Sequence, residues 1–423
     1  MELLLLLTSG LITWYCLHKK EYKRSILSIF CVLWASIFYL YTFRFFGLYD
    51  CKDGTFLMYL IGFASFFLGY IIIKPNKSNN SSKFNEITNK RKDLRVILLK
   101  CLAILSIYVL VKKSILAIPY WIAGGGGEVK SAIIQDDALN TGAALEILYT
   151  FLCRPIQIIM VIYAIVVIMS GLKDKSIMWL AVILTLSGYI CSGSKFALIE
   201  LAIMCAAYLW LFTKLSFRTA FNRYKYLFIG VSIILIFISM LMSTKDDGFL
   251  STAYSYMCGC MPCSDNALNS ILSDDNFYGL YSFNGILRAI NLIPRYLGIG
   301  PDFKIILDIV WENIMRFENT MYISPTIKYN AFVSMFTFFY ADGGFVGVFL
   351  LSFLFGLVCS LSLKYAYNRP TIYSCSLVLF LILLIFQSMV RFQLAFAPNA
   401  MALIYIILLL PRIKVPILND STR

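Results

Sequence analysis

The chain has 423 residues, of which 60% are hydrophobic and only 14% are charged, and its formal net charge is +14. Soluble domains are roughly 45–50% apolar and about 25% charged, so this composition excludes a water-soluble protein. Apolar stretches recur along the whole chain instead, and many of them approach the ~20 residues that a helix needs to cross the hydrocarbon core of a membrane.

Eleven apolar stretches predict an all-α fold, a polytopic transmembrane helix bundle of about eleven spans, with ten to twelve compatible with the sequence. Residues 1–423 are expected to form a single integral-membrane domain. In chain order, the spans are predicted near Leu3–Leu17, Ser25–Tyr41, Phe56–Ile73, Val96–Val111, Ile147–Ser170, Ile177–Cys191, Phe196–Phe212, Leu227–Met242, Phe345–Leu363, Ile372–Phe386 and Gln393–Leu410.

Basic residues gather in alternate loops, and this pattern predicts the orientation of the chain. Lys and Arg are retained on the cytoplasmic side during insertion, so the loops that hold the clusters are expected there and the amino terminus is expected outside. Because this topology accounts for much of the positive charge, no nucleic-acid partner is implied. The clusters are Lys19, Lys20, Lys23 and Arg24; Lys74, Lys77, Lys83, Lys90, Arg91, Lys92 and Arg95; and Lys214, Arg218, Arg223 and Lys225.

The interval 244–344, between the eighth and ninth spans, predicts a large helical loop on the outer face. Within it, Asp302–Phe317 is expected to form an amphipathic helix, because Lys304, Asp308 and Glu312 recur at a spacing of four among apolar residues. Such a helix either caps the bundle or lies against the lipid surface. The sequence leaves both placements open.

Cationic side chains on the predicted outer face are candidates for binding a phosphate. The guanidinium group offers a planar fork of donors that matches phosphate oxygens, which the ammonium group of Lys does not. The only histidine, His18, lies at the predicted cytoplasmic end of the first span, so an outer general base must be a carboxylate, a Tyr or the substrate itself. The outer cations are Arg154, Lys195, Arg288, Arg295, Arg316 and Arg391.

Three cysteines, Cys258, Cys260 and Cys263, form a C-x-C-x-x-C cluster in the outer interval. Disulfides persist in oxidising compartments. A disulfide is therefore favoured over a metal site in this cluster, although the sequence leaves open whether these cysteines form one, and a metal site built on several histidines is excluded.

Two local passages carry a family resemblance. One is S-G-S-K-F-A-L at 192–198 and the other is Y-A-D-G-G-F-V-G at 340–347. With the span count and the large late loop, they resemble the bacterial oligosaccharide repeat-unit polymerases, the Wzy or O-antigen polymerase family. Members of that family are often similar to S-G-S-R-G at the first passage and to Y-x-D-F-G-x-x-G at the second. Here Lys195 stands in place of Arg and Gly343 in place of Phe.

The resemblance implies a membrane glycosyltransferase that needs neither a metal nor another cofactor and spans the bacterial inner membrane many times. Its partners would be membrane lipids and an undecaprenyl-pyrophosphate-linked oligosaccharide, and the growing glycan would pass to a new lipid-linked repeat at the periplasmic face. Whether a chain-length regulator binds is left open. For such a reaction we assign, as a hypothesis, pyrophosphate binding to five cations because of their predicted location on one face: Arg154, Lys195, Arg288, Arg295 and Arg391. Asp342 and Glu318 are the candidates for acceptor orientation or base catalysis, and Tyr340 and Trp311 are the candidates for sugar contact.

Two alternatives stay open at the level of sequence. An O-antigen ligase shares the general plan, but ligases typically carry a histidine in the large outer loop, and this interval has none. A lipid-linked oligosaccharide flippase or other transporter commonly shows internal repeats and broken mid-membrane helices, and neither is evident. The sugars, the linkage and its stereochemistry, and the oligomeric state are not determined by the sequence.

Overall fold

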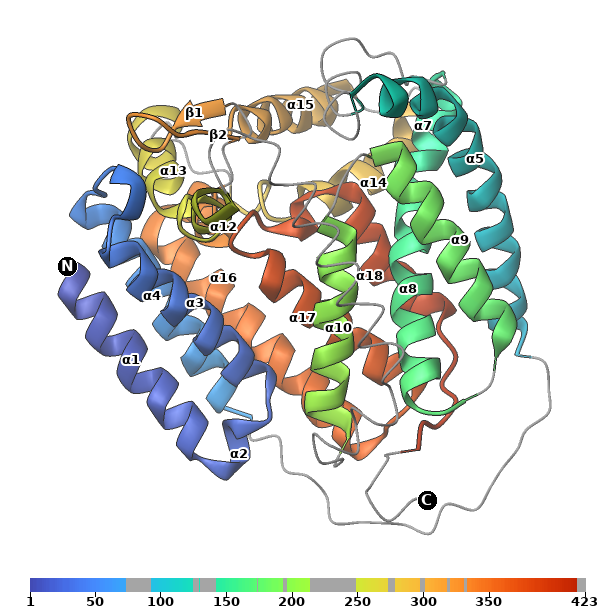
Figure 1. The fold of residues 1–423 in the computed structure, drawn as a ribbon, viewed down its shortest axis with the longest axis horizontal. Helices are drawn as coiled ribbons and strands as arrows, with labels where there is room; N and C mark the ends of the chain where they lie inside the picture. Colours follow the sequence, from blue (N-terminus) through green and yellow to red (C-terminus); the bar gives the residue numbers. More distant parts are fainter. Residues whose placement is uncertain are drawn as a thin grey trace. The chain divides into compact units, whose positions relative to one another are not determined.

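The computed structural model describes residues 1–73, 93–124, 129, 142–172, 174–192, 196–213, 249–272, 278–296, 301–317, 320–330 and 333–416. This part of the chain is almost wholly helical (Figure 1). One small antiparallel sheet joins strands β1 (Thr320–Tyr322) and β2 (Lys328–Asn330), with Met321 opposite Tyr329. The predicted all-α class is therefore confirmed.

Apolar helices of membrane-spanning character make up most of this part of the chain. Five stretches among the described residues are long and apolar enough to cross a membrane, and five shorter apolar helices accompany them. Each of the ten overlaps a predicted span, whereas the predicted span Leu227–Met242 lies outside the described residues. The long stretches are Asp53–Ile71, Leu94–Ala123, Ala143–Met169, Lys175–Ser192 and Met335–Asn368; the shorter ones are Glu2–His18, Ile26–Thr42, Ile199–Phe212, Ile372–Gln387 and Ala397–Leu409.

The chain divides into two compact units. The first comprises residues 1–76, 242–364 and 381–397, and the second comprises residues 77–241, 365–380 and 398–423. The first unit includes helices α1 (Glu2–His18), α2 (Lys20–Lys23), α3 (Ile26–Thr42), α4 (Asp53–Ile71), α12 (Phe249–Cys258), α13 (Cys260–Asn266), α14 (Asn284–Tyr296), α15 (Pro301–Arg316) and most of α16 (Met335–Asn368). The second includes α5 (Leu94–Gly124), α7 (Ala143–Leu148), α8 (Arg154–Met169), α9 (Lys175–Ser192), α10 (Phe196–Phe212) and most of α18 (Ala397–Leu409), while the division falls within α17 (Ile372–Gln387).

Aromatic side chains fill the core of the first unit. Helix α1 packs against both α3 and α4 (Figure 1). The rings of Phe30 and Phe66 are stacked, with their centroids 3.7 Å apart, and the buried indole of Trp34 donates a hydrogen bond of 3.1 Å to Oγ of Ser388. Large rings bury much apolar area at a small cost in side-chain entropy, so this core is both dense and well defined.

Two glycines let α4 and α16 approach each other closely. A Cβ atom on Gly69 would collide with the carbonyl oxygen of Phe353, and one on Gly356 would collide with the carbonyl oxygen of Phe66. Small residues at helix contacts allow this backbone approach in membranes, where burial of apolar surface from water does not drive helix association. The packing of α4 on α16 therefore depends on the missing side chains.

The connecting segments of the first unit meet at one end, which we call the loop end. The backbone N–H of Tyr49 donates to the carbonyl of Ile323 at 2.9 Å, and the N–H of Met335 donates to the carbonyl of Ser388 at 2.8 Å. Figure 1 shows α13, the β-hairpin and α15 together at this end of α3, α4 and α16. The described parts of the predicted large loop thus share one end with the loop that follows α3 and with the turn that follows α17.

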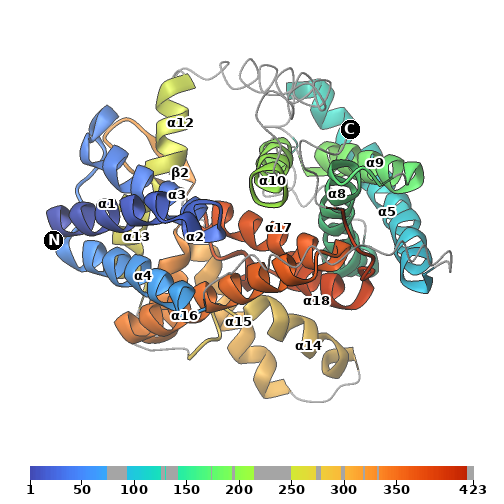
Figure 2. The same ribbon diagram turned by 90° about the horizontal axis from the view of Figure 1, so that it is seen from below.

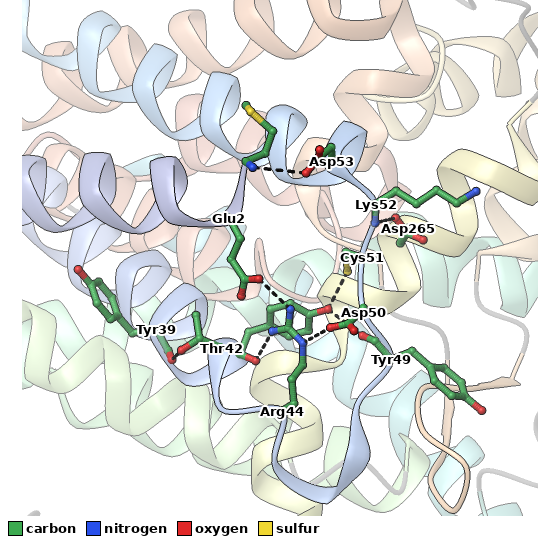
Figure 3. Close-up of polar contacts among 12 residues, drawn as sticks. Glu2, Tyr39, Thr42, Arg44, Tyr49, Asp50, Cys51, Lys52, Asp53 and Asp265 are labelled. Carbon is green, nitrogen blue, oxygen red and sulfur yellow. Dashed lines mark hydrogen bonds and ion pairs between the residues drawn. The ribbon is translucent and has the colours of Figure 1, made fainter.

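Ionic contacts fasten the loop that follows α3 at the loop end (Figure 3). The guanidinium of Arg44 bonds to Oδ1 of Asp50 at 2.6 Å and to Oε2 of Glu2 at 3.1 Å. The backbone N–H of Lys52 donates to Oδ1 of Asp265 at 2.8 Å. These bonds attach the start of α1 to the loop and the loop to the end of α13.

Helix α15 confirms the predicted helix Asp302–Phe317 to within one residue at each end. Leu307, Val310 and Ile314 are buried, and α15 contacts α14 (Figure 2). The opposite face exposes Ile305 and Ile309, so this helix is apolar on two sides and not only on the side that packs. Helix α16, by contrast, begins ten residues before the predicted span Phe345–Leu363, because Met335–Gly344 continues it through a bend.

The predicted fourth span, Val96–Val111, ends too early. Helix α5 continues from Leu94 to Gly124. The prediction stopped at Val111, before two consecutive lysines, but Nζ of the second, Lys113, forms an ion pair of 2.6 Å with Oε1 of Glu146 on α7. Pairing reduces the cost of a buried charge, so the helix runs through this position. Helix α5 packs against α8 and α9 in the second unit.

Candidate functional site

Two arginines and two aromatic rings form a cluster at the loop end. Cζ of Arg288 lies 4.5 Å from the centroid of the Trp311 ring, and Cζ of Arg391 lies 4.4 Å from the centroid of the Phe396 ring. The two rings meet edge to face, with centroids 5.9 Å apart. All four side chains are half-buried. Because a cation is attracted to the face of an aromatic ring, the ring pair holds both guanidinium groups in one place. We call these four residues the arginine–aromatic cluster.

Close backbone packing brings the members of the cluster together. A Cβ atom on Gly285, in the first turn of α14, would lie 2.6 Å from the carbonyl oxygen of Leu394 and 2.7 Å from that of Phe396. Helix α14 therefore lies directly on the short helix η4 (Gln393–Ala395) and the residue after it. Arg288 follows Gly285 by about one helical turn, and its guanidinium lies over the ring of Trp311, which in turn contacts the ring of Phe396.

Asp342, the predicted catalytic carboxylate, binds the turn that leads into α14. Its Oδ1 accepts a hydrogen bond of 2.8 Å from the backbone N–H of Tyr281, and its Oδ2 accepts one of 2.9 Å from the N–H of Ser282. Its own carbonyl accepts from the N–H of Tyr278 at 2.9 Å. The side chain of Asp342 is buried, with 3% of the residue exposed. This geometry makes Asp342 an anchor for the turn that precedes Arg288.

The turn also carries a tyrosine hydroxyl close to this carboxylate. Burial raises the pKa of Tyr281 to about 12, and the negative charge of Asp342 acts in the same direction. The hydroxyl of Tyr281 therefore stays protonated at neutral pH and is a hydrogen-bond donor there rather than a general base.

The second resemblance passage contains the bend in α16. Gly343 and Gly344 depart from helical geometry, and Gly344 has a φ of +58°, which L-residues with a side chain rarely adopt. Tyr340, a predicted sugar contact, lies one turn before the bend and packs edge to face on Phe345, with ring centroids 5.2 Å apart. The other predicted sugar contact, Trp311, belongs to the arginine–aromatic cluster.

The structure gives no position relative to the cluster for the remaining predicted site residues. Glu318 and Lys195 lie outside the described residues, and so does the side chain of Arg295. Arg154 belongs to the second unit, where Nη1 donates to Oε1 of Gln157 at 3.3 Å and Cζ lies 5.9 Å from the Tyr149 ring centroid. Of the five predicted pyrophosphate ligands, the structure thus places Arg288 and Arg391 together.

Sequence reasoning missed three features near these residues. Phe396 read as one apolar residue of a span, and nothing in the sequence marks it as the ring beneath Arg391. Lys113 had a usable signal, because the apolar run resumes directly after it. In the second unit its ammonium also lies 4.4 Å from the Tyr149 ring centroid, at the π-helix η2 (Tyr149–Cys153). Asn284, the first residue of α14, was not singled out in the sequence.

The three cysteines of the C-x-C-x-x-C cluster are free thiols in the structure, so the disulfide that the sequence favoured over a metal site, and left open, is not formed. Cys258, Cys260 and Cys263 are buried thiols. Sγ of Cys258 lies 3.9 Å from the carbonyl oxygen of Ile37 on α3, so this thiol packs against a neighbouring helix. Burial raises the pKa of Cys258 to about 12. Among the described residues, no group of three or more His, Cys, Asp or Glu side chains is arranged to hold a metal ion.

No protein-family model matches the sequence, no curated protein matches it, and no solved structure matches its fold.

Proposed function

We propose that this chain is an inner-membrane glycan polymerase of bacteria. In this proposal it transfers a growing oligosaccharide from undecaprenyl pyrophosphate to a new lipid-linked repeat unit at the periplasmic face. The observation that carries the proposal is the arginine–aromatic cluster, in which Arg288 and Arg391 each lie over one of two contacting rings at the loop end of a bundle of apolar helices. The family resemblance of 192–198 and 340–347 supports the same class of reaction.

The chemistry of the leaving group explains why two arginines suit this reaction. When the glycan leaves its carrier, negative charge develops on the pyrophosphate, and fixed donors that point at this charge lower the barrier. Guanidinium groups form two parallel hydrogen bonds to phosphate oxygens. The rings of Trp311 and Phe396 hold both cations in place before the substrate binds, so little reorganisation is needed as the charge forms.

The position of the cluster suits a lipid-linked substrate. The loop end lies opposite the end of α1 that leads to Lys20 and Lys23. If the basic end is cytoplasmic, as its charges predict, the cluster faces the periplasm near the outer leaflet. A pyrophosphate attached to a membrane-embedded polyprenyl chain is held at this depth.

Asp342 has a positioning role in this proposal. Both of its carboxylate oxygens accept backbone N–H groups of the turn before α14, and α14 carries Arg288. The acceptor hydroxyl then gives its proton to another group, and Glu318 stays a candidate for that base.

The experiment is a polymerisation assay with purified protein and its lipid-linked repeat. Arg288→Ala and Arg391→Ala are each expected to lower the rate about 100-fold, as the loss of one such donor does elsewhere. Arg316→Ala is the matched control, because this arginine is exposed on the neighbouring helix α15, and its rate should stay close to that of the native protein. Normal polymerisation by folded variants at positions 288 and 391 would refute the proposal.

The rival functions are separated in cells by the length of the glycan. A strain that lacks this protein should decorate its surface with single repeats if polymerisation is lost. The absence of all repeats would instead indicate ligation or export.

A further inference from the structure

The side chain of Asn284 is buried without a hydrogen-bond partner. The residue is 0% exposed, and neither Oδ1 nor Nδ2 of its amide has a partner among the described residues. Native proteins pair nearly all buried polar groups, and each exception calls for an explanation. An amide that bonds to nothing in the ligand-free protein is explained if a ligand supplies the missing partners.

Asn284 lies next to the elements that form the proposed active site. It precedes Arg288 by four residues, so both side chains lie on the same side of α14. It also lies two residues after Ser282, whose backbone N–H donates a hydrogen bond to Asp342. Its neighbour Gly285 packs on the backbone of Phe396. The unpaired amide is therefore between the anchored turn and the arginine–aromatic cluster.

The two unpaired atoms specify the kind of ligand group. The amide nitrogen donates hydrogen bonds, and the amide oxygen accepts them. A phosphate has only acceptor oxygens when ionised, so it would satisfy the nitrogen and leave the oxygen unpaired. A sugar hydroxyl both donates and accepts, and two neighbouring hydroxyls can satisfy both amide atoms together.

We propose that Asn284 is a saccharide-binding residue, whose amide binds hydroxyl groups of the sugar next to the pyrophosphate. This inference rests on the proposed function, because it takes the phosphate to lie at Arg288 and Arg391. Since Asn284 is 0% exposed in the ligand-free protein, the segments packed around the start of α14 must move apart when the sugar enters. Formation of the missing hydrogen bonds offsets the cost of that movement.

Asn284→Leu provides the test, because leucine has a similar volume and no polar atoms. Removing an unpaired buried amide should leave the melting temperature of the ligand-free, full-length protein unchanged or raise it. Two probes are then compared by thermal shift and by titration in detergent: undecaprenyl pyrophosphate, and the same lipid carrying its oligosaccharide repeat. The native protein should bind the oligosaccharide-bearing lipid more tightly than the bare lipid. In the variant this gain in affinity should be about 5- to 100-fold smaller, while the bare lipid should bind to both proteins equally.

Asn269→Leu is the matched control. The Asn269 amide already donates to the carbonyl of Asp265 and accepts from Nζ of Lys52, so this variant should lose stability and keep the sugar-dependent increase. The inference is overturned if Asn284→Leu lowers the melting temperature of the ligand-free protein markedly, since the amide would then have a structural partner. It is also overturned if the variant retains the increase or if the native protein shows none.

The proposed function has a separate readout. Suppose that the native protein binds the sugar, that Asn284→Leu abolishes this binding, and that the native protein forms no glycan ladder. This result would support the role of Asn284 in saccharide binding and refute the proposed polymerisation. A normal glycan ladder made by Asn284→Leu with an unchanged sugar-dependent increase would refute only the role of Asn284.

Discussion

Replacing Asp342 with alanine should release the turn before α14 and, through it, Arg288. The carboxylate accepts two backbone N–H groups, from Tyr281 at 2.8 Å and from Ser282 at 2.9 Å. A hydrogen bond to a charged group contributes roughly 1.5–3 kcal/mol. The variant no longer has to bury a carboxylate, which offsets part of the loss, so we take the lower end and expect the turn to be destabilised by about 3 kcal/mol.

The assay is amide hydrogen exchange of the full-length protein in detergent micelles, followed by mass spectrometry. Exchange through local opening depends on the free energy of that opening, so about 3 kcal/mol corresponds to exchange at Tyr281 and Ser282 that is roughly 100-fold faster. Polymerisation should fall together with this protection. Asp342→Asn, which keeps one carbonyl oxygen as an acceptor, should show a smaller change in both measurements.

Two results would refute this reasoning. Unchanged exchange at Tyr281 and Ser282 in folded Asp342→Ala would show that the carboxylate does not anchor the turn. Lost polymerisation with normal exchange would show that Asp342 acts on the substrate directly, as a base or an acceptor-orienting group, and that Arg288 reaches its position without it.

Further predictions concern packing, a buried ion pair and a thiol. Gly69→Ala should lower the free energy of unfolding by about 1–3 kcal/mol through overpacking, whereas Gly54→Ala, with nothing within 4 Å of its Cβ, should not; equal melting temperatures would contradict this. Lys113→Met should lower the free energy of unfolding by roughly 2–3 kcal/mol, which is less than for a fully buried pair because a third of the Glu146 side chain is exposed. In a double-mutant cycle, adding Glu146→Gln should restore most of the lost stability. Burial raises the pKa of Cys51 to about 12, so its thiol stays protonated at pH 7 and should react with maleimide about 10³-fold more slowly than glutathione. The reaction rate should rise with pH as long as the protein remains folded. A rate equal to that of glutathione would disprove burial of this thiol.

Local patterns were sufficient for the helices. Each apolar run in the described chain forms a helix, and most of these helices begin and end within a few residues of the predicted bounds. The reason is that a membrane requires every backbone group to bond within its own segment. The amphipathic spacing through Asp308 and Glu312 likewise predicted α15 to within one residue. One exception has a long-range cause: α5 continues through Lys113 because Glu146, far along the chain, neutralises it.

The candidate site could be predicted only as an inventory of residues. Composition and loop charges selected Arg288 and Arg391 as cations of one face, but the pairing of these two depends on Gly285 allowing α14 to reach the backbone of Phe396. Asp342 was selected from the sequence as a candidate, but its bonds to Tyr281 and Ser282 join segments that lie far apart in the sequence.

The amino-acid sequence by itself determined that this protein is helical and apolar enough for a membrane, since hydrophobicity and helix formation are properties of neighbouring residues. Only the tertiary structure decided which charges meet, that Cys258 faces a helix rather than another sulfur atom, and that the amide of Asn284 is buried unpaired. Such outcomes depend on atoms brought within a few ångströms by packing between distant segments, and a residue pattern along the chain contains no measure of that distance.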